Sequence, residues 1–90
     1  DSQYIIRIDT TMTLDTVWVN GTGGTTLTIN AKRKRSGSFT DLFNNYTGAS
    51  STTTAIVPTT TSFVKGDEIW IVIRVITGTW TYINLQFDMH

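Results

Sequence analysis

The segment that most constrains the fold is residues 68–76, which read EIWIVIRVI and are apolar apart from one Glu and one Arg. Six of these residues are Ile or Val, whose β-branched side chains favour extended strands over helices. The flanking tripeptides, Lys65-Gly66-Asp67 and Thr77-Gly78-Thr79, are typical of turns. An exposed strand of this composition would pair with other chains, so we expect it to lie centrally in a sheet or to be covered.

The rest of the chain shares this preference for extended structure. Nineteen Thr and six Ser make up more than a quarter of the sequence, whereas helix formers are scarce, with one Glu and three Lys. Apolar and polar residues alternate over residues 25–31 and again over 83–88, which is typical of strands with one buried face. The sequence therefore predicts an all-β fold, an antiparallel β-sandwich of the jelly-roll type with about seven to eight strands.

The length of 90 residues fits one domain, because chains divide into domains only at greater length. We therefore expect residues 1–90 to form a single β-sandwich domain, with residues 1–10 as an N-terminal arm or an edge strand. Residues 39–46 predict either a short strand or one helical turn. Residues 47–54 are small and polar and predict a loop, followed by an edge strand that ends at Pro58.

Composition argues against several functional classes. Seven Lys and Arg balance seven Asp and Glu, so the chain lacks the basic excess that drives nucleic-acid binding. The absence of Cys excludes disulfides, a thiol nucleophile and zinc-finger sites. No apolar run reaches the roughly 18–20 residues of a membrane span. We expect no nucleic acid, membrane span or cofactor, and the start at Asp1 without Met leads us to expect a processed chain or a piece of a longer one.

No combination of residues predicts an active site. The single histidine, His90, is the last residue, where it would be a poor base for a catalytic triad. Five carboxylates lie at turns or near loops, where solvated or turn-capping roles are common: Asp9, Asp15, Asp41, Asp67 and Glu68. We therefore expect a protein that is not an enzyme.

Two groups of residues could be drawn as metal ligands. Asp41 lies near Asn44 and Asn45, and Asp88 lies near His90. Neither group has the spacing of a known metal-binding loop such as an EF-hand. We therefore expect no metal.

The four residues Lys32, Arg33, Lys34 and Arg35 form the one run of charges in the sequence. On a strand they would alternate between the two faces, so that at most two point the same way. We expect a solvated edge strand on which the cations prevent edge-to-edge pairing. The alternative is contact with an acidic partner surface or a polyanionic glycan.

Aromatic residues near the C-terminus suggest an interaction face. In residues 68–76, Ile69, Ile71, Ile73 and Val75 share one face, which we assign to the core. The opposite face and the following strand place four residues together, barring a bulge: Trp70, Arg74, Trp80 and Tyr82. Aromatics and Arg are enriched at subunit interfaces, and an aromatic ring beside polar donors also suits a sugar. A third interpretation is that these aromatics close the core of the sandwich or cover its end.

Several segments also carry a family resemblance. They are Thr13-Leu14-Asp15-Thr16-Val17 before a Gly-rich turn, residues 25–30, the Ser/Thr tract at 50–54, and Ser62-Phe63-Val64-Lys65-Gly66-Asp67-Glu68-Ile69 before the apolar run. In this order, over roughly residues 12–88, the chain resembles a compact jelly-roll module of tailed-bacteriophage virion proteins. That module is found in tail fibres, receptor-binding tips and capsid decoration proteins. The last segment also resembles the C-terminal hairpin of trimeric tumour-necrosis-factor-like and C1q-like jelly rolls.

The resemblance implies a virion structural protein on the surface of a phage particle, outside cells. It would form a homo-oligomer, with a trimer favoured, and contact other virion proteins and host-surface glycans. One alternative is a carbohydrate-binding module or lectin that uses exposed Trp80 or Tyr82. Another is a fragment of an enzyme whose active site lies elsewhere.

Overall fold

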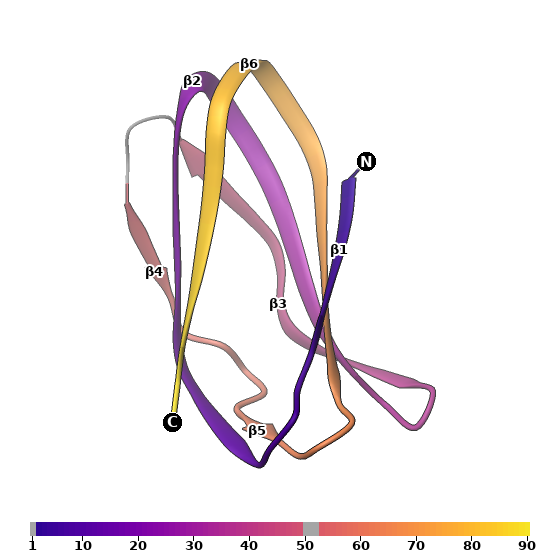
Figure 1. Ribbon diagram of the computed structural model, residues 1–90. Helices are drawn as coiled ribbons and strands as arrows, with labels where there is room; N and C mark the ends of the chain where they lie inside the picture. Colours follow the sequence, from indigo (N-terminus) through magenta and orange to yellow (C-terminus); the bar gives the residue numbers. More distant parts are fainter. Residues whose placement is uncertain (1, 50–52) are drawn as a thin grey trace.

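Two long strands form the frame of the molecule (Figure 1), a computed structural model that describes residues 2–49 and 53–90. Strand β2 runs over Met12–Arg35 and strand β6 over Glu68–Met89. They pair antiparallel along nearly their whole length, from Leu14↔Met89 to Lys34↔Glu68. Residues 68–76, which the sequence predicts to be central or covered, thus have β2 as a neighbour on one side, and residues 68–73 of them have β1 on the other.

The ribbon made by β2 and β6 folds over on itself and so creates two layers. Figure 1 shows both strands bending together at the top of the molecule. The pairing is irregular at this bend, between Thr22↔Tyr82 and Gly24↔Gly78. Gly23 and Gly78 have φ values of 100° and 86° there, a left-handed conformation that favours glycine.

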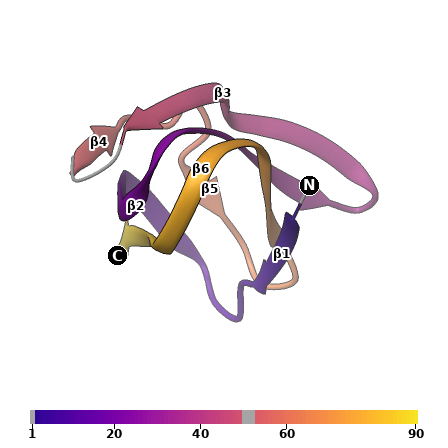
Figure 2. The same cartoon turned by 90° about the horizontal axis from the view of Figure 1, so that it is seen from above.

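Shorter strands extend each layer (Figure 2). The first layer has the order β1-β6-β2-β3, with β1 at Ser2–Arg7 and β3 at Ser38–Ala49. In the second layer, β4 at Thr54–Ile56 pairs with β2, and β5 at Ser62–Phe63 pairs with the start of β2. Because β2 and β6 each contribute a segment to both layers, the two layers together contain eight strand segments. The predicted all-β antiparallel sandwich is confirmed.

The structure decides two open points of the sequence prediction. Residues 39–46, for which a strand or a helical turn was open, belong to strand β3. The predicted loop at 47–54 is wrong at its beginning, because β3 continues to Ala49 by pairing with Thr26 of β2. Residues 50–52 of that predicted loop lie outside the described residues. The described residues form no helix, and hence none long and apolar enough to cross a membrane.

The core lies between the two layers. Ile69, Ile71 and Ile73 of β6 are buried there as predicted, whereas the side chain of Val75 lies outside the described residues. The other buried apolar side chains come from every strand except β1 and from the segment after it: Ile8, Leu14, Val17, Val19, Leu27, Ile29, Ala31, Leu42, Phe43, Ile56 and Phe63. Burial of this apolar surface is the main force that holds the layers together.

Trp80 packs against the glycines of the bend. A Cβ atom at Gly21 would lie 2.8 Å from Cζ3 of Trp80, and one at Gly24 would overlap the indole ring itself. Trp80 also packs against the core together with Ile83. The predicted face shared with Trp70 and Arg74 therefore does not include Trp80, whose ring packs against the core. The irregular pairing between Thr22↔Tyr82 and Gly24↔Gly78 includes Trp80 and interrupts the regular alternation of β6 before Ile83 is reached.

An ion pair between the buried Asp67 and the partly exposed Arg35 fastens the turn before β6. The Asp67 carboxylate, only 2% exposed, accepts hydrogen bonds from Nε and Nη2 of Arg35 at 2.9 and 2.7 Å. It also accepts one from the Val64 N–H at 2.9 Å. Asp67 therefore caps its turn, one of the two roles expected for it, but it is not solvated, because its carboxylate also joins the end of β2 to the turn. The hydrogen bonds from Arg35 lower the pKa of Asp67 below 3.8, although burial opposes this effect.

We predict that Asp67→Asn lowers the free energy of unfolding by about 1–3 kcal/mol at neutral pH, because charge-assisted hydrogen bonds are lost. The pKa of Asp67 is lower in the folded state, so its stabilisation is complete above pH 3.8 and is lost as the pH falls through the folded-state pKa. In urea denaturation between pH 2 and pH 7, the free energy of unfolding should therefore fall more steeply with acid for the wild type than for Asp67→Asn. The exposed Asp9 provides the control Asp9→Asn, and an equal effect of both substitutions would contradict the prediction.

We also predict that Gly24→Ala destabilises the protein by about 1–3 kcal/mol, because the added methyl group displaces the Trp80 ring. The backbone of Gly24 has no positive φ, so the cost comes from packing rather than from backbone strain. In a Trp80→Ala background the same change should cost less by at least about 1 kcal/mol, as a double-mutant cycle would measure. Strict additivity of the two substitutions would contradict this account.

Candidate functional site

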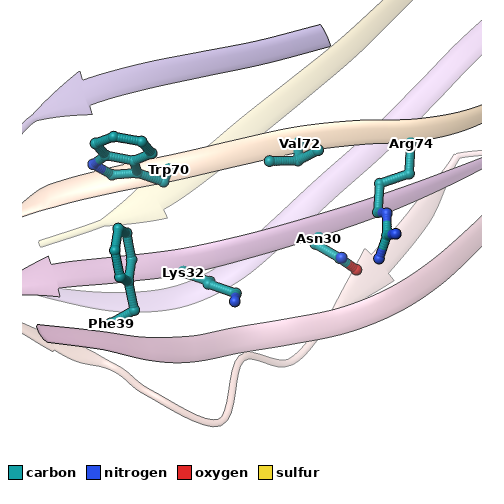
Figure 3. A pocket seen from close by; sticks show the side chains of 6 residues that line it. All are labelled: Asn30, Lys32, Phe39, Trp70, Val72 and Arg74. Atoms are coloured by element: carbon teal, nitrogen blue, oxygen red, sulfur yellow. The ribbon is translucent and has the colours of Figure 1, made fainter. Parts of the chain in front are cut away.

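The outer face of the first layer contains a hollow of about 340 Å³ (Figure 3). Three neighbouring strands, β2, β3 and β6, supply its lining residues: Asn30, Lys32, Phe39, Trp70, Val72 and Arg74. Alternate residues of one strand share a face of the sheet. This geometry places Trp70, Val72 and Arg74 opposite the buried isoleucines of the same strand.

Strand register assembles the hollow from distant parts of the chain. Trp70 is paired with Lys32, and Val72 with Asn30. Phe39 arrives from the third strand through the β2–β3 hairpin, in which Ser36 and Gly37 have φ values of 49° and 82°. Positive φ at both central residues is typical of a tight two-residue hairpin turn.

One end of the hollow is aromatic. The rings of Phe39 and Trp70 meet edge to face, with centroids 5.3 Å apart and an interplanar angle of 86°. The indole Nε1 of Trp70 donates a hydrogen bond of 2.9 Å to Oε1 of Glu68. Nζ of Lys34 lies 4.8 Å from the Trp70 ring centroid, within the range of a cation–π interaction. These contacts hold the Trp70 ring in one orientation.

The other end of the hollow is polar. Figure 3 shows the polar ends of Asn30 and Arg74 close together there, whereas Lys32 lies between them and Phe39, with its Nζ 6.0 Å from the Phe39 ring centroid. Asn30 is buried, with 8% of its surface exposed, whereas Arg74 is exposed. Nζ of Lys32 lies 4.0 Å from Oδ1 of Asp41, an exposed pair of little energetic weight. The hollow therefore offers apolar ring surface and hydrogen-bond donors side by side.

The run of four cations is divided between the two faces of β2. Lys32 and Lys34 lie on the face of the hollow. Arg33 donates from Nη1 to the Ser62 carbonyl oxygen at 2.8 Å, and Arg35 pairs with Asp67. The prediction that this run forms an edge strand is wrong, because β2 is paired here with β6 on one side and β3 on the other.

The four residues predicted to share one face do not lie together. Trp70 and Arg74 line the hollow, whereas Trp80 and Tyr82 line a second cavity of about 530 Å³. This cleft lies between β1 and the last part of β6, which are the edges of the two layers. Its lining side chains are apolar apart from two tyrosine hydroxyls and the indole N–H of Trp80: Tyr4, Ile6, Ile71, Ile73, Trp80, Tyr82, Ile83, Leu85 and Phe87. Trp80 thus packs against the core, as the third interpretation of the aromatics has it, and also lines the wall of this cleft.

The candidate metal ligands His90 and Asp88 are held by separate partners, whereas the side chains of two other candidates, Asn44 and Asn45, lie outside the described residues. Nδ1 of His90 lies 2.7 Å from Oδ2 of Asp15, and the His90 backbone pairs with that of Thr13. Asp88 instead accepts hydrogen bonds from Nε1 of Trp18 at 2.8 Å and from Nε2 of Gln86 at 3.2 Å. Within residues 2–49 and 53–90, no group of three or more His, Cys, Asp or Glu side chains is arranged to hold a metal ion.

Sequence reasoning missed Phe39 and Asn30. Both residues join Trp70 only through the pairing of β2 with β3 and β6. The available signal was Arg35-Ser36-Gly37-Ser38, because a two-residue turn there fixes Lys34 opposite Phe39. Asn30 gave no signal of its own, since it looks like one more polar residue in an alternating strand.

In comparisons with known proteins, no family model, no curated protein and no solved structure matches the chain.

Proposed function

We propose that this protein is a non-enzymatic recognition module that binds a saccharide in the hollow on its outer face. One observation carries the proposal: Trp70 and Phe39, held edge to face, stand next to Asn30, Lys32 and Arg74 in a single depression. Binding sites commonly combine apolar and aromatic walls with a few convergent polar groups.

The chemistry of a pyranose matches this arrangement. One face of such a ring presents C–H groups, which pack on an aromatic surface, and its rim presents hydroxyl groups that need hydrogen-bond partners. In the hollow, Trp70 and Phe39 supply the aromatic surface, while Lys32 and Arg74 supply donors. The ring of Trp70 is already fixed by Glu68 and Lys34, so binding would cost little ordering of that side chain.

The proposed setting is the surface of a tailed-phage particle, where the module would serve attachment at a tail fibre or receptor-binding tip, or decorate the capsid. The support for this setting is the resemblance of residues 12–88 to virion jelly-roll modules. A low charge content and a surface rich in threonine also suit a domain that works outside cells. The ligand in that setting would be a glycan of the host surface.

We predict that Trp70→Ala abolishes saccharide binding on a glycan array and in calorimetric titration, because it removes the aromatic wall of the hollow. Trp18→Ala is the matched control, since Trp18 is also an indole with a hydrogen-bonded Nε1 but lies outside the hollow. Circular dichroism should show that both variants remain folded. Binding that survives Trp70→Ala, or no glycan bound by the wild type, would contradict the proposal.

The cleft between the layer edges supports a second candidate function, that of a structural subunit which self-associates. Tyr4, Ile6 and Tyr82 at this cleft are 55%, 41% and 54% exposed. Exposed apolar surface beside strand edges favours pairing between chains. A homo-oligomer, with a trimer favoured, would fit the particle surface proposed above.

For this second candidate we predict a mass above that of a monomer in light scattering after size-exclusion chromatography. The Ile6→Lys variant should contain more monomer than the wild type, because the substitution places a charge in the cleft. Ile5→Lys is the matched control, since Ile5 is the adjacent residue of β1, is 51% exposed and points to the opposite face. A monomeric wild type would overturn the structural candidate and leave the saccharide proposal standing.

A further inference from the structure

We propose that the saccharide bound in the hollow is acidic, and that Arg74, assisted by Lys32, binds a carboxylate of the sugar. This inference rests on the proposed function, because it assigns a ligand class to the same hollow. It adds a charge requirement that aromatic stacking alone does not impose.

The charge around the hollow is the first support. Its lining includes two cations, Lys32 and Arg74, and no carboxylate. The strand register extends this asymmetry to the surrounding face, which carries four cations against two carboxylates: Arg7, Lys32, Lys34 and Arg74 against Asp41 and Glu68. The whole chain is balanced, with seven of each sign, so the positive excess belongs to this face.

The existing contacts of the charged groups are the second support. Glu68 accepts a hydrogen bond from the Trp70 indole, and Asp41 lies beside Lys32 at the rim. Arg74 forms no ion pair or side-chain hydrogen bond with any residue that the structure describes. An exposed guanidinium of this kind can bind a carboxylate with two parallel hydrogen bonds. Arg35 shows that geometry with Asp67 on the other face.

The spacing along β6 indicates the size of the ligand. Trp70 and Arg74 are four residues apart on one strand, which corresponds to roughly 13 Å. This distance is longer than one pyranose ring. We therefore infer an oligosaccharide in which one sugar stacks at Phe39 and Trp70, and a neighbouring sugar carries the carboxylate toward Arg74. The buried Asn30 lies between these two ends, opposite Val72.

The test begins with a glycan array that pairs uronic-acid and sialic-acid glycans with their carboxyl-reduced forms and includes sulfated and neutral glycans. We expect binding to the carboxylated members and loss of binding after carboxyl reduction. In solution, trigalacturonate and its methyl ester serve as the charged and uncharged probes. The affinity for carboxylated glycans should also fall as the NaCl concentration rises.

Arg74→Gln should weaken binding of carboxylated glycans by about 10- to 100-fold, as expected for the loss of a charged hydrogen-bond pair. Arg7→Gln is the matched control. It removes the same charge from the same face, but Arg7 lies on β1 opposite Glu68 and outside the hollow. We expect its effect to stay within about 2-fold, since it acts only through screened long-range attraction.

The outcomes separate the two levels of the argument. Equal binding of carboxylated and carboxyl-reduced glycans that still depends on Trp70 would overturn the acidic-sugar inference and leave the saccharide proposal intact. Binding of sulfated glycans alone, equal losses in Arg74→Gln and Arg7→Gln, or equal binding of poly-glutamate would also overturn it. If no glycan of any charge is bound, the proposed function itself fails.

Discussion

The continuous pairing of β2 with β6 is the constraint on which the rest of the structure depends. Because these two strands remain hydrogen-bonded from Leu14↔Met89 to Lys34↔Glu68, one bend in the ribbon sets the positions of both layers. β1 and β3 then extend the first layer from either side, and β4 extends the second. The bend itself depends on residues without side chains, since the Trp80 ring occupies the space above Gly24. The hollow and the cleft both follow from this arrangement.

The sequence was sufficient to predict the fold class, because β-branched residues and turns are local signals. It also predicted the buried face of β6, where Ile69 and Ile73 alternate without interruption. It did not predict that β2 continues through Gly21–Gly24, because a glycine-rich segment suggests a turn whether the chain reverses or merely bends. The irregular pairing around Trp80 could not be predicted for a related reason, since the register of a strand depends on its partner strand as well as on its own sequence.

The sequence predicted only part of the candidate site, because the other part is assembled by pairing between strands. Trp70 and Arg74 share a face by simple alternation, and both were identified. Phe39 and Asn30 join them through pairing between strands, which no local pattern encodes. Trp80 was grouped with Trp70 because both are large aromatics in successive segments, whereas the bend carries Trp80 to the cleft between the layers.

The four cations of β2 lie on two faces with different roles, and this limits how the strand can change in evolution. Arg33 and Arg35 anchor the segment that leads into β6, so their replacement would loosen the frame. Lys32 and Lys34 contribute mainly to the outer face. Mutation at the even-numbered positions can therefore alter which ligands are recognised while the odd-numbered positions preserve the architecture. A single inserted residue in this strand would exchange the two roles at once, so we expect lineages of this protein to vary here by substitution and not by insertion.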